Sequence, residues 1–327
     1  MTERLVVSPS PHWKTDKTVP ALMLDVVIAL MPAVIASIVF FGWKALAIIL
    51  TSVSSAVISE AIYEKAVKRD ITIKDYSAVI TGILLAMNMP PGVPLWMPAI
   101  GSAFAIVIAK QLFGGLGCNF VNPALAGRAF LMAAWPLHMT RDWLAPGFFG
   151  GVDAGASPTP LAVLKGESSG VLPGLWDMLL GNRAGCLGET SIIAILIGGI
   201  YLIWKEVIDP RIPLGFIGTV FVLTWVFGKP GAFFQGNAVY HVLSGGLFLG
   251  AFFMATDYVT SPVTARGRLL MGIGCGAITV LIRLWGGYPE GVSYSILLMN
   301  LVTPLIDRVV VPRYYGWKHE ARKEKAL

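Results

Sequence analysis

The sequence is poor in charged residues, and this shortage excludes most soluble proteins. Only 13% of its 327 residues are Asp, Glu, Lys or Arg, whereas 55% are hydrophobic. A soluble chain of this composition would have too little polar surface to cover its core. Most of the chain therefore faces lipid. The fold class that we expect is all-α, a polytopic membrane protein.

Cysteine is also scarce. Cys118, Cys186 and Cys275 lie far apart, and no two of them have the C-x-x-C spacing of a self-contained iron–sulfur or zinc site. We therefore expect neither a metal centre nor a structural disulfide. A cleavable signal peptide is not visible either, because the first twenty residues are polar, proline-rich and basic. The first apolar run, from Val19, is expected to stay in the membrane.

The basic residues follow membrane topology. The net charge is +6, but the Lys and Arg residues lie in short connectors between apolar runs, so we expect no nucleic-acid partner. Most of them fall on one side of the membrane if the N-terminus is cytoplasmic. The excess of positive charge on the cytoplasmic side predicts that both termini are cytoplasmic, in a bacterial inner membrane.

About ten spans are expected, because a helix needs about 20 apolar residues to cross the hydrocarbon core. These spans divide the chain into a cytoplasmic segment 1–18, a five-helix repeat 19–136, an extracytoplasmic loop 137–188, a second five-helix repeat 189–308 and a basic cytoplasmic tail 309–327. The expected spans are Val19–Phe41, Ala45–Tyr63, Tyr76–Met89, Leu95–Leu112, Phe120–Pro136, Glu189–Lys205, Ile212–Phe227, His241–Thr256, Leu269–Trp285 and Val292–Ile306.

A weak internal repeat relates the two halves. Residues 80–86 are echoed by residues 243–249, and each segment is followed by a proline-containing break and another apolar helix. Five spans in each half make the two repeats inverted. Such repeats are typical of transport folds, in which interrupted segments line a site at the midplane, here Asn88–Pro91 and Asp257–Pro262. The alternative is that small residues only let helices pack closely.

The stretch Gly114–Arg128 is the richest in chemistry. Its glycines let backbone approach a ligand, and Asn119 and Asn122 offer hydrogen-bond donors and acceptors. An ordinary turn and helix cap would use the same residues. Arg128 lies two turns into a predicted membrane helix, where a charge is costly unless it meets an anion or carbonyls. We interpret Arg128 as an anion-binding residue.

Two further clusters lie in or beside the outer connector. Thr159 follows a loop of small residues and proline, a position that favours a turn residue or a helix N-cap. Gly181–Ser191 combines glycine, arginine and hydroxyl groups before a helix, which suits a phosphate or a ring edge. The alternative for this second cluster is a plain helix start, in which Glu189 complements the helix dipole.

These motifs together resemble the NqrB/RnfD family over nearly the whole chain. The short N-terminus and modest length are closer to the RnfD branch, the membrane subunits of Rnf ferredoxin:NAD oxidoreductase complexes, than to the longer NqrB. The matching segments are Ser8–His12, Gly114–Arg128, Gly188–Ser191, Ala255–Asp257 with Ser261-Pro262, Gly286–Val292 and Met299-Asn300.

The resemblance implies two flavins. In the family, a threonine in a D-x-x-[ST]-x-x-T-P-L-like loop carries FMN through a phosphoester bond, and the match here is Thr159, six residues after Asp153. The usual S-G-A-T core is replaced by Ala156-Ser157-Pro158-Thr159. A noncovalent riboflavin is expected at the Gly114–Asn122 loop. The cofactor-binding residues that we expect are Thr159, Ser157, Arg128, Glu189, Thr190, Asn119, Asn122 and Lys110.

The resemblance also implies a function. The chain would relay electrons between ferredoxin and NAD across the membrane and couple this flow to Na⁺ or H⁺ translocation, with Asp25 and Asp257, and also Glu60, near the ion path. Its partners would be the membrane lipid and the other Rnf-type subunits, RnfA, RnfB, RnfC, RnfE and RnfG. No residue of this chain is expected to be catalytic by itself. Two alternatives stay open: a urea-transporter-like solute channel and a structural subunit without a cofactor.

Overall fold

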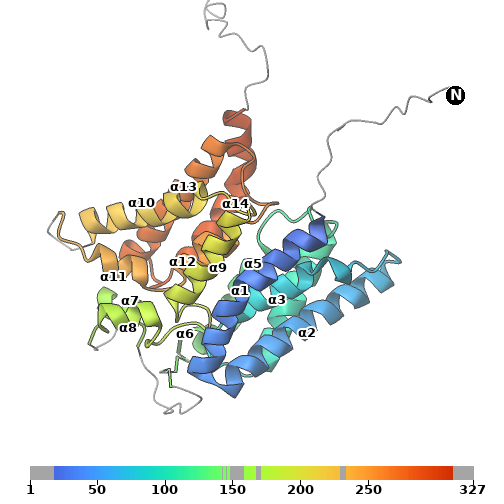
Figure 1. Cartoon of the computed structure of the whole chain (residues 1–327), viewed down its shortest axis with the longest axis horizontal. Coiled ribbons are helices and arrows are strands. Elements are labelled where there is room, and N and C mark those ends of the chain that lie inside the picture. The colour runs from blue at the N-terminus through green and yellow to red at the C-terminus, as the bar shows by residue number, and fades with distance from the viewer. Residues whose placement is uncertain are drawn as a thin grey trace, which may run out of the picture.

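The computed structural model describes residues 18–141, 143–144, 146–147, 158–166, 171–228 and 233–311. Within these ranges the chain is a bundle of helices joined by loops (Figure 1). The predicted terminal segments, apart from Thr18 and residues 309–311, lie outside the described residues, as do Asp153 and Ser157.

The first half contains α1 (Val19–Phe41), α2 (Trp43–Ala66), η1 (Ile73–Asp75), α3 (Ser77–Met87), α4 (Trp96–Phe104), η2 (Ala105–Lys110), η3 (Gln111–Phe113), α5 (Pro123–Ala134) and α6 (Pro136–Arg141). The short helices α7 (Pro160–Lys165) and α8 (Leu175–Leu180) follow. The second half contains α9 (Ile192–Trp204), α10 (Arg211–Phe227), α11 (Ala238–Leu243), α12 (Leu247–Leu249), η5 (Gly250–Met254), α13 (Ala265–Trp285) and α14 (Val292–Val309).

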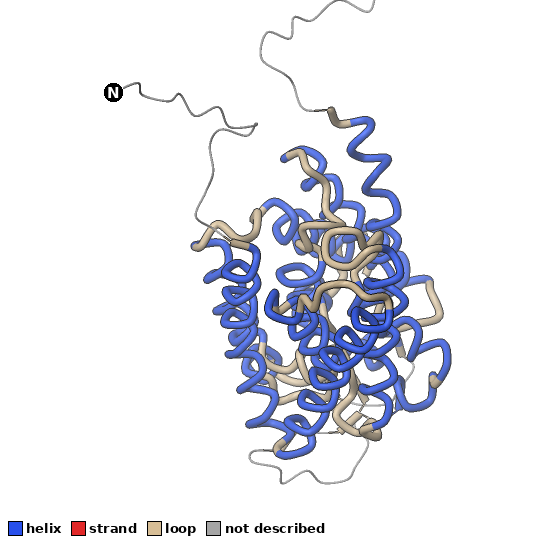
Figure 2. The backbone as a smooth tube through the Cα atoms, turned by 90° about the vertical axis from the view of Figure 1, so that its right-hand side faces the viewer, coloured by secondary structure: helices blue, strands red, loops and turns tan. Residues whose placement is uncertain are grey.

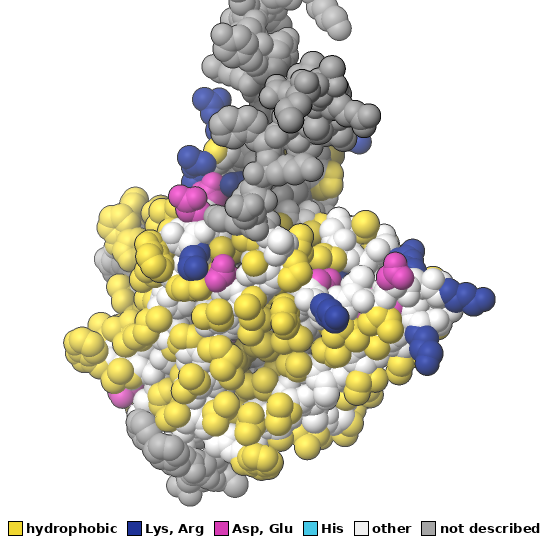
Figure 3. All heavy atoms as spheres, turned by 45° about the vertical axis from the view of Figure 1, so that its right-hand side comes forward, with side chains coloured by type: hydrophobic (Ala, Val, Ile, Leu, Met, Phe, Trp, Pro, Cys, Tyr) yellow, Lys and Arg dark blue, Asp and Glu magenta, His cyan; other side chains and the backbone are white. Residues whose placement is uncertain are grey.

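Five described helices are long and apolar enough to cross a bilayer: Val19–Phe41, Trp43–Ala66, Trp96–Phe113, Ala265–Trp285 and Val292–Val309. Each coincides with a predicted span. On α1, four large apolar side chains spaced three or four residues apart are exposed, which is the pattern of a lipid-facing stripe: Leu24, Ile28, Met31 and Ile35. Figure 3 shows hydrophobic side chains over much of the visible surface. The prediction of a polytopic helical membrane protein is confirmed.

Other predicted spans are shorter helices or interrupted ones. Ser77–Met87, Pro123–Ala134, Ile192–Trp204 and Arg211–Phe227 are apolar helices of 10–17 residues. An 11-residue helix such as α3 rises about 16 Å, only about half of the hydrocarbon thickness. The His241–Thr256 span is divided into α11, a break at Ser244–Gly246, and α12 with η5. The number of ten crossings stays a prediction.

The two halves pack in corresponding ways. In the first half α2 packs against α3 and α4, and in the second α10 packs against α11 and α13. Between the halves, α1 contacts α9 and α5 contacts α14. The start of α1 and the end of α14 lie at one end of the molecule, and α7 and α8 lie at the other (Figures 1 and 2). This packing fits a repeat, whereas the opposite orientation of the repeats in a membrane stays a prediction.

The segment Gly181–Ser191, which we call the bridging connector, contacts two places where the helical hydrogen bonding stops. One is the end of α3, and the other is the break between α11 and α12. The backbone N–H of Gly188 donates to Met87 O (2.7 Å), and that of Leu187 donates to Met89 O (3.0 Å), so carbonyls freed at the end of α3 are satisfied. A Cβ at Gly188 would lie 2.7 Å from Met87 Cβ and 2.9 Å from Leu249 Cδ2. Only glycine lets the connector approach this closely.

Candidate functional site

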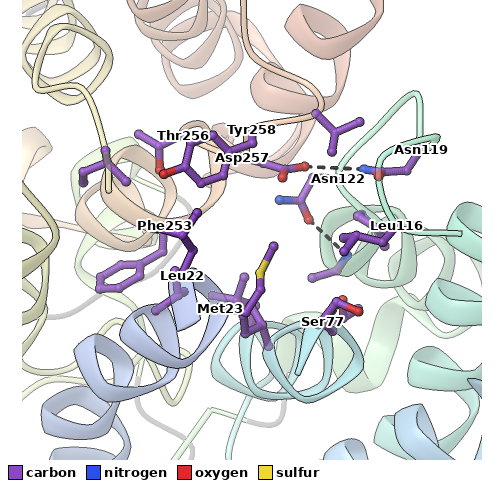
Figure 4. Close-up of a pocket in the computed structure, with 18 of the residues that line it drawn as sticks. Leu22, Met23, Ser77, Leu116, Asn119, Asn122, Phe253, Thr256, Asp257 and Tyr258 are labelled. Atoms are coloured by element: carbon purple, nitrogen blue, oxygen red, sulfur yellow. Dashed lines mark hydrogen bonds between the residues drawn. The ribbon is translucent and has the colours of Figure 1, made fainter. Parts of the chain in front are cut away.

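A pocket lies between the halves near the end of the molecule where α1 begins. Figure 4 shows polar side chains, Asn119, Asn122 and Asp257, together with apolar Leu22 and Phe253 around it. Its walls come from α1, α3, α9, the loop before α5, and the end of η5 with the loop that follows. Apolar walls with a few polar groups are typical of a small-molecule site.

Two amides of the predicted loop build one side of the pocket. Asn122 caps α5, because its Oδ1 accepts from the N–H groups of Ala124 (3.0 Å) and Leu125 (3.3 Å). Its Nδ2 donates to Met254 O at 3.3 Å, which ties α5 to η5. Asn119 Nδ2 donates to Val121 O at 3.1 Å. The loop is therefore both a helix cap and a pocket wall.

Lys110 also lines the pocket, but its charge is already paired. Its Nζ lies 2.5 Å from Glu60 Oε1 and donates to Ser77 Oγ at 2.6 Å. Gln111 Nε2 donates to the same Glu60 oxygen at 2.8 Å. Lys110 and Glu60 are both buried. The sequence placed Lys110 at a cofactor and Glu60 near the ion path, and the structure joins them in one ion pair.

The two predicted ion-path aspartates lie in different surroundings. Asp257 is in the pocket wall, where it accepts from Asn119 Nδ2 (3.4 Å) and Thr260 Oγ1 (3.2 Å). Burial raises the pKa of Asp257 by more than these hydrogen bonds lower it. Asp25 is away from this pocket, and it accepts from Tyr201 Oη (2.7 Å) with Lys205 Nζ at 3.9 Å.

A second polar region, which we call the charge network, lies deeper between the halves. Arg128 Nη2 is 2.5 Å from Glu290 Oε2, and Arg128 Nη1 donates to Asn88 Oδ1 at 2.7 Å. Glu189 Oε1 lies 4.0 Å from Arg128 Nη1. The anions that balance Arg128 are thus carboxylates of the protein itself. Sequence reasoning missed Glu290, because a glutamate in a Gly- and Pro-rich turn carries no signal of burial.

Two more arginines complete the charge network. Arg283 Nη2 donates to Ser244 O at 3.1 Å and Arg183 Nη2 donates to Glu189 O at 2.6 Å. Further bonds run from Arg283 Nη1 to His241 O and from Arg183 Nη1 to Leu243 O. The arginines therefore satisfy carbonyls freed where α11 ends. The sequence placed Arg183 in the expected outer loop and Arg283 near the end of an expected span, and a basic residue at an apolar helix end was the signal available.

Cys186, Glu189 and Glu290 bring one possible ligand atom each to within 4.8 Å of one another. Arg128 Nη2 also lies 3.7 Å from Cys186 Sγ and 2.5 Å from Glu290 Oε2. Because the guanidinium group of Arg128 lies beside all three of these groups, its positive charge opposes the binding of a cation there.

Thr159 lies on the short helix that covers the charge network. Its Oγ1 accepts from Ala162 N at 3.4 Å, so Thr159 is the N-cap of α7, and it is buried. Leu161 Cδ1 and Arg283 Nη2 would lie 2.8 and 3.2 Å from a Cβ at Gly245, so α7 and Arg283 both approach the break between α11 and α12 at this glycine. Lys165 Nζ donates to Gly286 O at 2.6 Å.

The pocket and the charge network are joined by hydrogen bonds. Asn122 binds Met254 O, and Asn88 Nδ2 approaches Met254 Sδ at 3.5 Å while its Oδ1 accepts from Arg128. A chain of polar groups, which we call the polar column, thus runs from the pocket wall to Glu290 near α7. Of the predicted site residues, Asn119, Asn122, Lys110 and Asp257 gather at its pocket end. Arg128, Glu189 and Thr159 gather at the other, and Thr190 is buried in the bridging connector.

Comparison with known proteins identifies a family and several relatives to which this chain is similar. Residues 6–316 match the model of the NQR2, RnfD, RnfE family. The chain is 48% identical over 324 residues, covering 98% of both chains, to the D component of the Na(+)-translocating ferredoxin:NAD(+) oxidoreductase complex of Acetobacterium woodii. It is 49% identical over 318 residues, covering 95% of this chain and 96% of the relative, to the D component of the proton-translocating complex of Clostridium ljungdahlii.

Proposed function

Because the chain belongs to the NQR2, RnfD, RnfE family, we propose that it is the membrane subunit that relays electrons across the bilayer in an Rnf-type ion-translocating ferredoxin:NAD oxidoreductase complex. The observation that carries this proposal is the polar column between the two halves. It links a pocket near one end of the molecule to a threonine-bearing helix near the other. Both ends hold residues that the sequence marks as flavin-binding.

Thr159 is the residue that we propose to carry FMN through a phosphoester bond. Within the part of the chain that the structure describes, its hydroxyl makes one long hydrogen bond, as an acceptor at 3.4 Å, so an ester oxygen can take its place without breaking a strong contact there. Packing of Leu161 at Gly245 and the bond from Lys165 to Gly286 O hold α7, and therefore Thr159, in position. A bound flavin supplies one- and two-electron chemistry, while this chain fixes its position and the charges around it.

The pocket is where we propose the noncovalent riboflavin. Apolar walls suit a flat ring system, whereas Asn119, Asn122 and Lys110 offer donors and acceptors for its carbonyl and hydroxyl groups. The amides keep their orientation because each already bonds to backbone. Asn119 and Asn122, which the sequence also allows to form an ordinary turn and helix cap, thus have both roles in this proposal.

We propose that ion movement accompanies the electrons, with Asp257 at the pocket end. Two relatives of nearly equal identity are named for different ions, Na⁺ in one and protons in the other. Overall similarity therefore does not select the ion. The proposed partners are the other Rnf-type subunits, RnfA, RnfB, RnfC, RnfE and RnfG, in a bacterial inner membrane with both termini cytoplasmic.

The covalent flavin is tested by mass spectrometry of the Thr159 peptide from the complex purified with its flavin transferase present. We expect the mass of FMN on wild-type Thr159, none in Thr159→Val, and an unchanged modification in the matched control Thr224→Val, since Thr224 is a buried threonine of α10 that bonds within its own helix. An unmodified wild-type peptide in a fully assembled complex would instead identify a structural subunit.

A further inference from the structure

Four buried polar atoms around the break between α11 and α12 have no hydrogen-bond partner among the described residues: Glu189 Oε1, His241 Nδ1, Ser244 Oγ and Arg283 Nε. Only Glu60 Oε2 shares this property elsewhere in the described part of the chain. Unsatisfied polar atoms are rare in protein interiors and costly. Their concentration at one break marks a site where a polar species binds.

The carboxyl group of Glu189 is the titratable group at this site. It is 2% exposed, and glycines flank it closely on two sides. A Cβ at Gly246 would lie 2.9 Å from Oε1, and a Cβ at Gly185 would lie 3.3 Å from Oε2. Because glycine has no side chain, these two positions leave room for the carboxyl group of Glu189 in the protein interior.

Among the described residues, the charged and titratable groups around Glu189 come from several elements. Arg128 lies on α5, Arg183 and Cys186 on the bridging connector, and Glu290 in the turn before α14. Arg283 of α13 interacts electrostatically with Glu189, and it donates to the carbonyl of His241 on α11. Arg183 and Arg283 direct their bonded nitrogens to backbone carbonyls and not to the carboxyl group of Glu189.

Glu290 and Glu189, the two acids of the charge network, differ in the hydrogen bonds that stabilise their ionised forms. Glu290 takes a direct bond from Arg128 at 2.5 Å, which favours its ionised form. Among the described residues, the carboxyl group of Glu189 accepts a hydrogen bond only from the backbone N–H of Cys186, at 3.4 Å, and the nearest nitrogen of Arg128 is 4.0 Å away. Their carboxylate oxygens lie within 4.8 Å of each other. When one proton is shared by such a pair, it goes to the acid that lacks the strong partner.

We propose that the Glu189 carboxyl group is a proton-binding site, reached from the α7 side past Glu290. The side chain of Glu290 is 14% exposed and that of Glu189 is 2% exposed, so Glu290 is the more accessible of these two neighbouring acids. This inference rests on the proposed function. One electron arriving beside α7 adds one negative charge, one proton bound at Glu189 from outside water cancels it, and both leave together.

Carbodiimide labelling of the purified complex tests the site directly, because dicyclohexylcarbodiimide reacts with protonated carboxyl groups in apolar surroundings. We expect mass spectrometry to find the label on Glu189 and to find it decreasing with rising pH, by up to about tenfold per pH unit above its titration point. Glu60 is the matched control: it is equally buried but directly paired with Lys110 at 2.5 Å, so it should stay unlabelled. Label on Glu290 or Glu60 without Glu189 would overturn the assignment. Protection of Glu189 by Na⁺ would overturn it in favour of a cation site.

Infrared difference spectra of the oxidised and reduced complex provide the second readout. We expect a protonated-carboxyl band that Glu189→Gln removes and Glu60→Gln keeps. Identical bands in all three proteins would contradict the proposal even if labelling failed for lack of access. Flavin content of the same samples separates the failure of the proton site from the failure of the proposed flavin role. If Glu189 is labelled but the Thr159 peptide is unmodified, only the proposed flavin role is refuted.

Discussion

The pocket and the charge network differ in how they use polar groups. At the pocket, the amides of Asn119 and Asn122 are neutral, bond to backbone and leave space beside them. In the charge network, the polar groups are buried arginines and glutamates, and the charge of each is balanced by its neighbours. A change at the pocket should therefore alter what binds, whereas a change in the charge network should alter whether the protein folds.

Removal of Arg128 should have the largest effect. Arg128→Met leaves Glu290 and Asn88 without their shared partner, and loss of one member of a buried pair costs about 3–5 kcal/mol. We expect a strong fall in the thermal midpoint of the purified protein, measured by tryptophan fluorescence in detergent. The double variant Arg128→Met/Glu290→Gln should recover part of the loss, because it removes the uncompensated charge. Equal stability of wild type and Arg128→Met would show that the charge network is not a folding element.

A methyl group at the bridging connector should have the next largest effect. Gly188→Ala brings a Cβ to 2.7 Å from Met87 Cβ, and overpacking of this kind costs about 1–3 kcal/mol. Gly287→Ala is the matched control, since no atom lies within 4 Å of the added Cβ. Denaturation of both variants should show a lower midpoint for Gly188→Ala only. An equal fall of the midpoint in both variants would show that loss of backbone freedom at glycine is the cause, and not the close contact with Met87.

At the pocket, substitutions of Asn122 should separate its role as the cap of α5 from its proposed role in binding riboflavin. Asn122→Ala removes the cap of α5, at a cost of about 1 kcal/mol, and should release riboflavin. Asn122→Ser keeps an oxygen that can cap the N–H groups of Ala124 and Leu125 but loses the amide donor to Met254 O. We therefore expect near-normal stability with reduced riboflavin in Asn122→Ser, measured by flavin extraction. Full riboflavin in both variants would place that cofactor elsewhere.

The sequence predicted the helices better than the contacts between them. Apolar runs located the long spans, because the length of a lipid-crossing helix is fixed by membrane thickness. The span expected from Phe120 begins as a helix at Pro123, and Asn122 is its cap, which the sequence leaves open as the alternative to a ligand-binding residue. In contrast, Glu290 and Arg283 meet partners far away in sequence, and no local pattern reports such pairing. The bridging connector was expected to be an outer loop, and only the folded chain shows it closing breaks in α3 and in the segment formed by α11 and α12.

The smallest effect is expected at an exposed ion cluster beside the pocket, where Asp209 holds Arg268 of α13 at 3.0 Å and Arg211 of α10 at 3.2 Å. Burial by itself would raise the pKa of Asp209, but the N–H of Arg211 and the two guanidinium groups outweigh it and hold this pKa below the ordinary aspartate value. A lowered folded-state pKa adds stability that is present above the unfolded pKa and is lost as the pH falls through the folded one. Asp209→Asn should therefore lower the thermal midpoint slightly at neutral pH and leave it unchanged in strong acid. Because partly exposed pairs contribute little, a loss as large as that of Arg128→Met would contradict the contrast between surface pairs and the buried charge network.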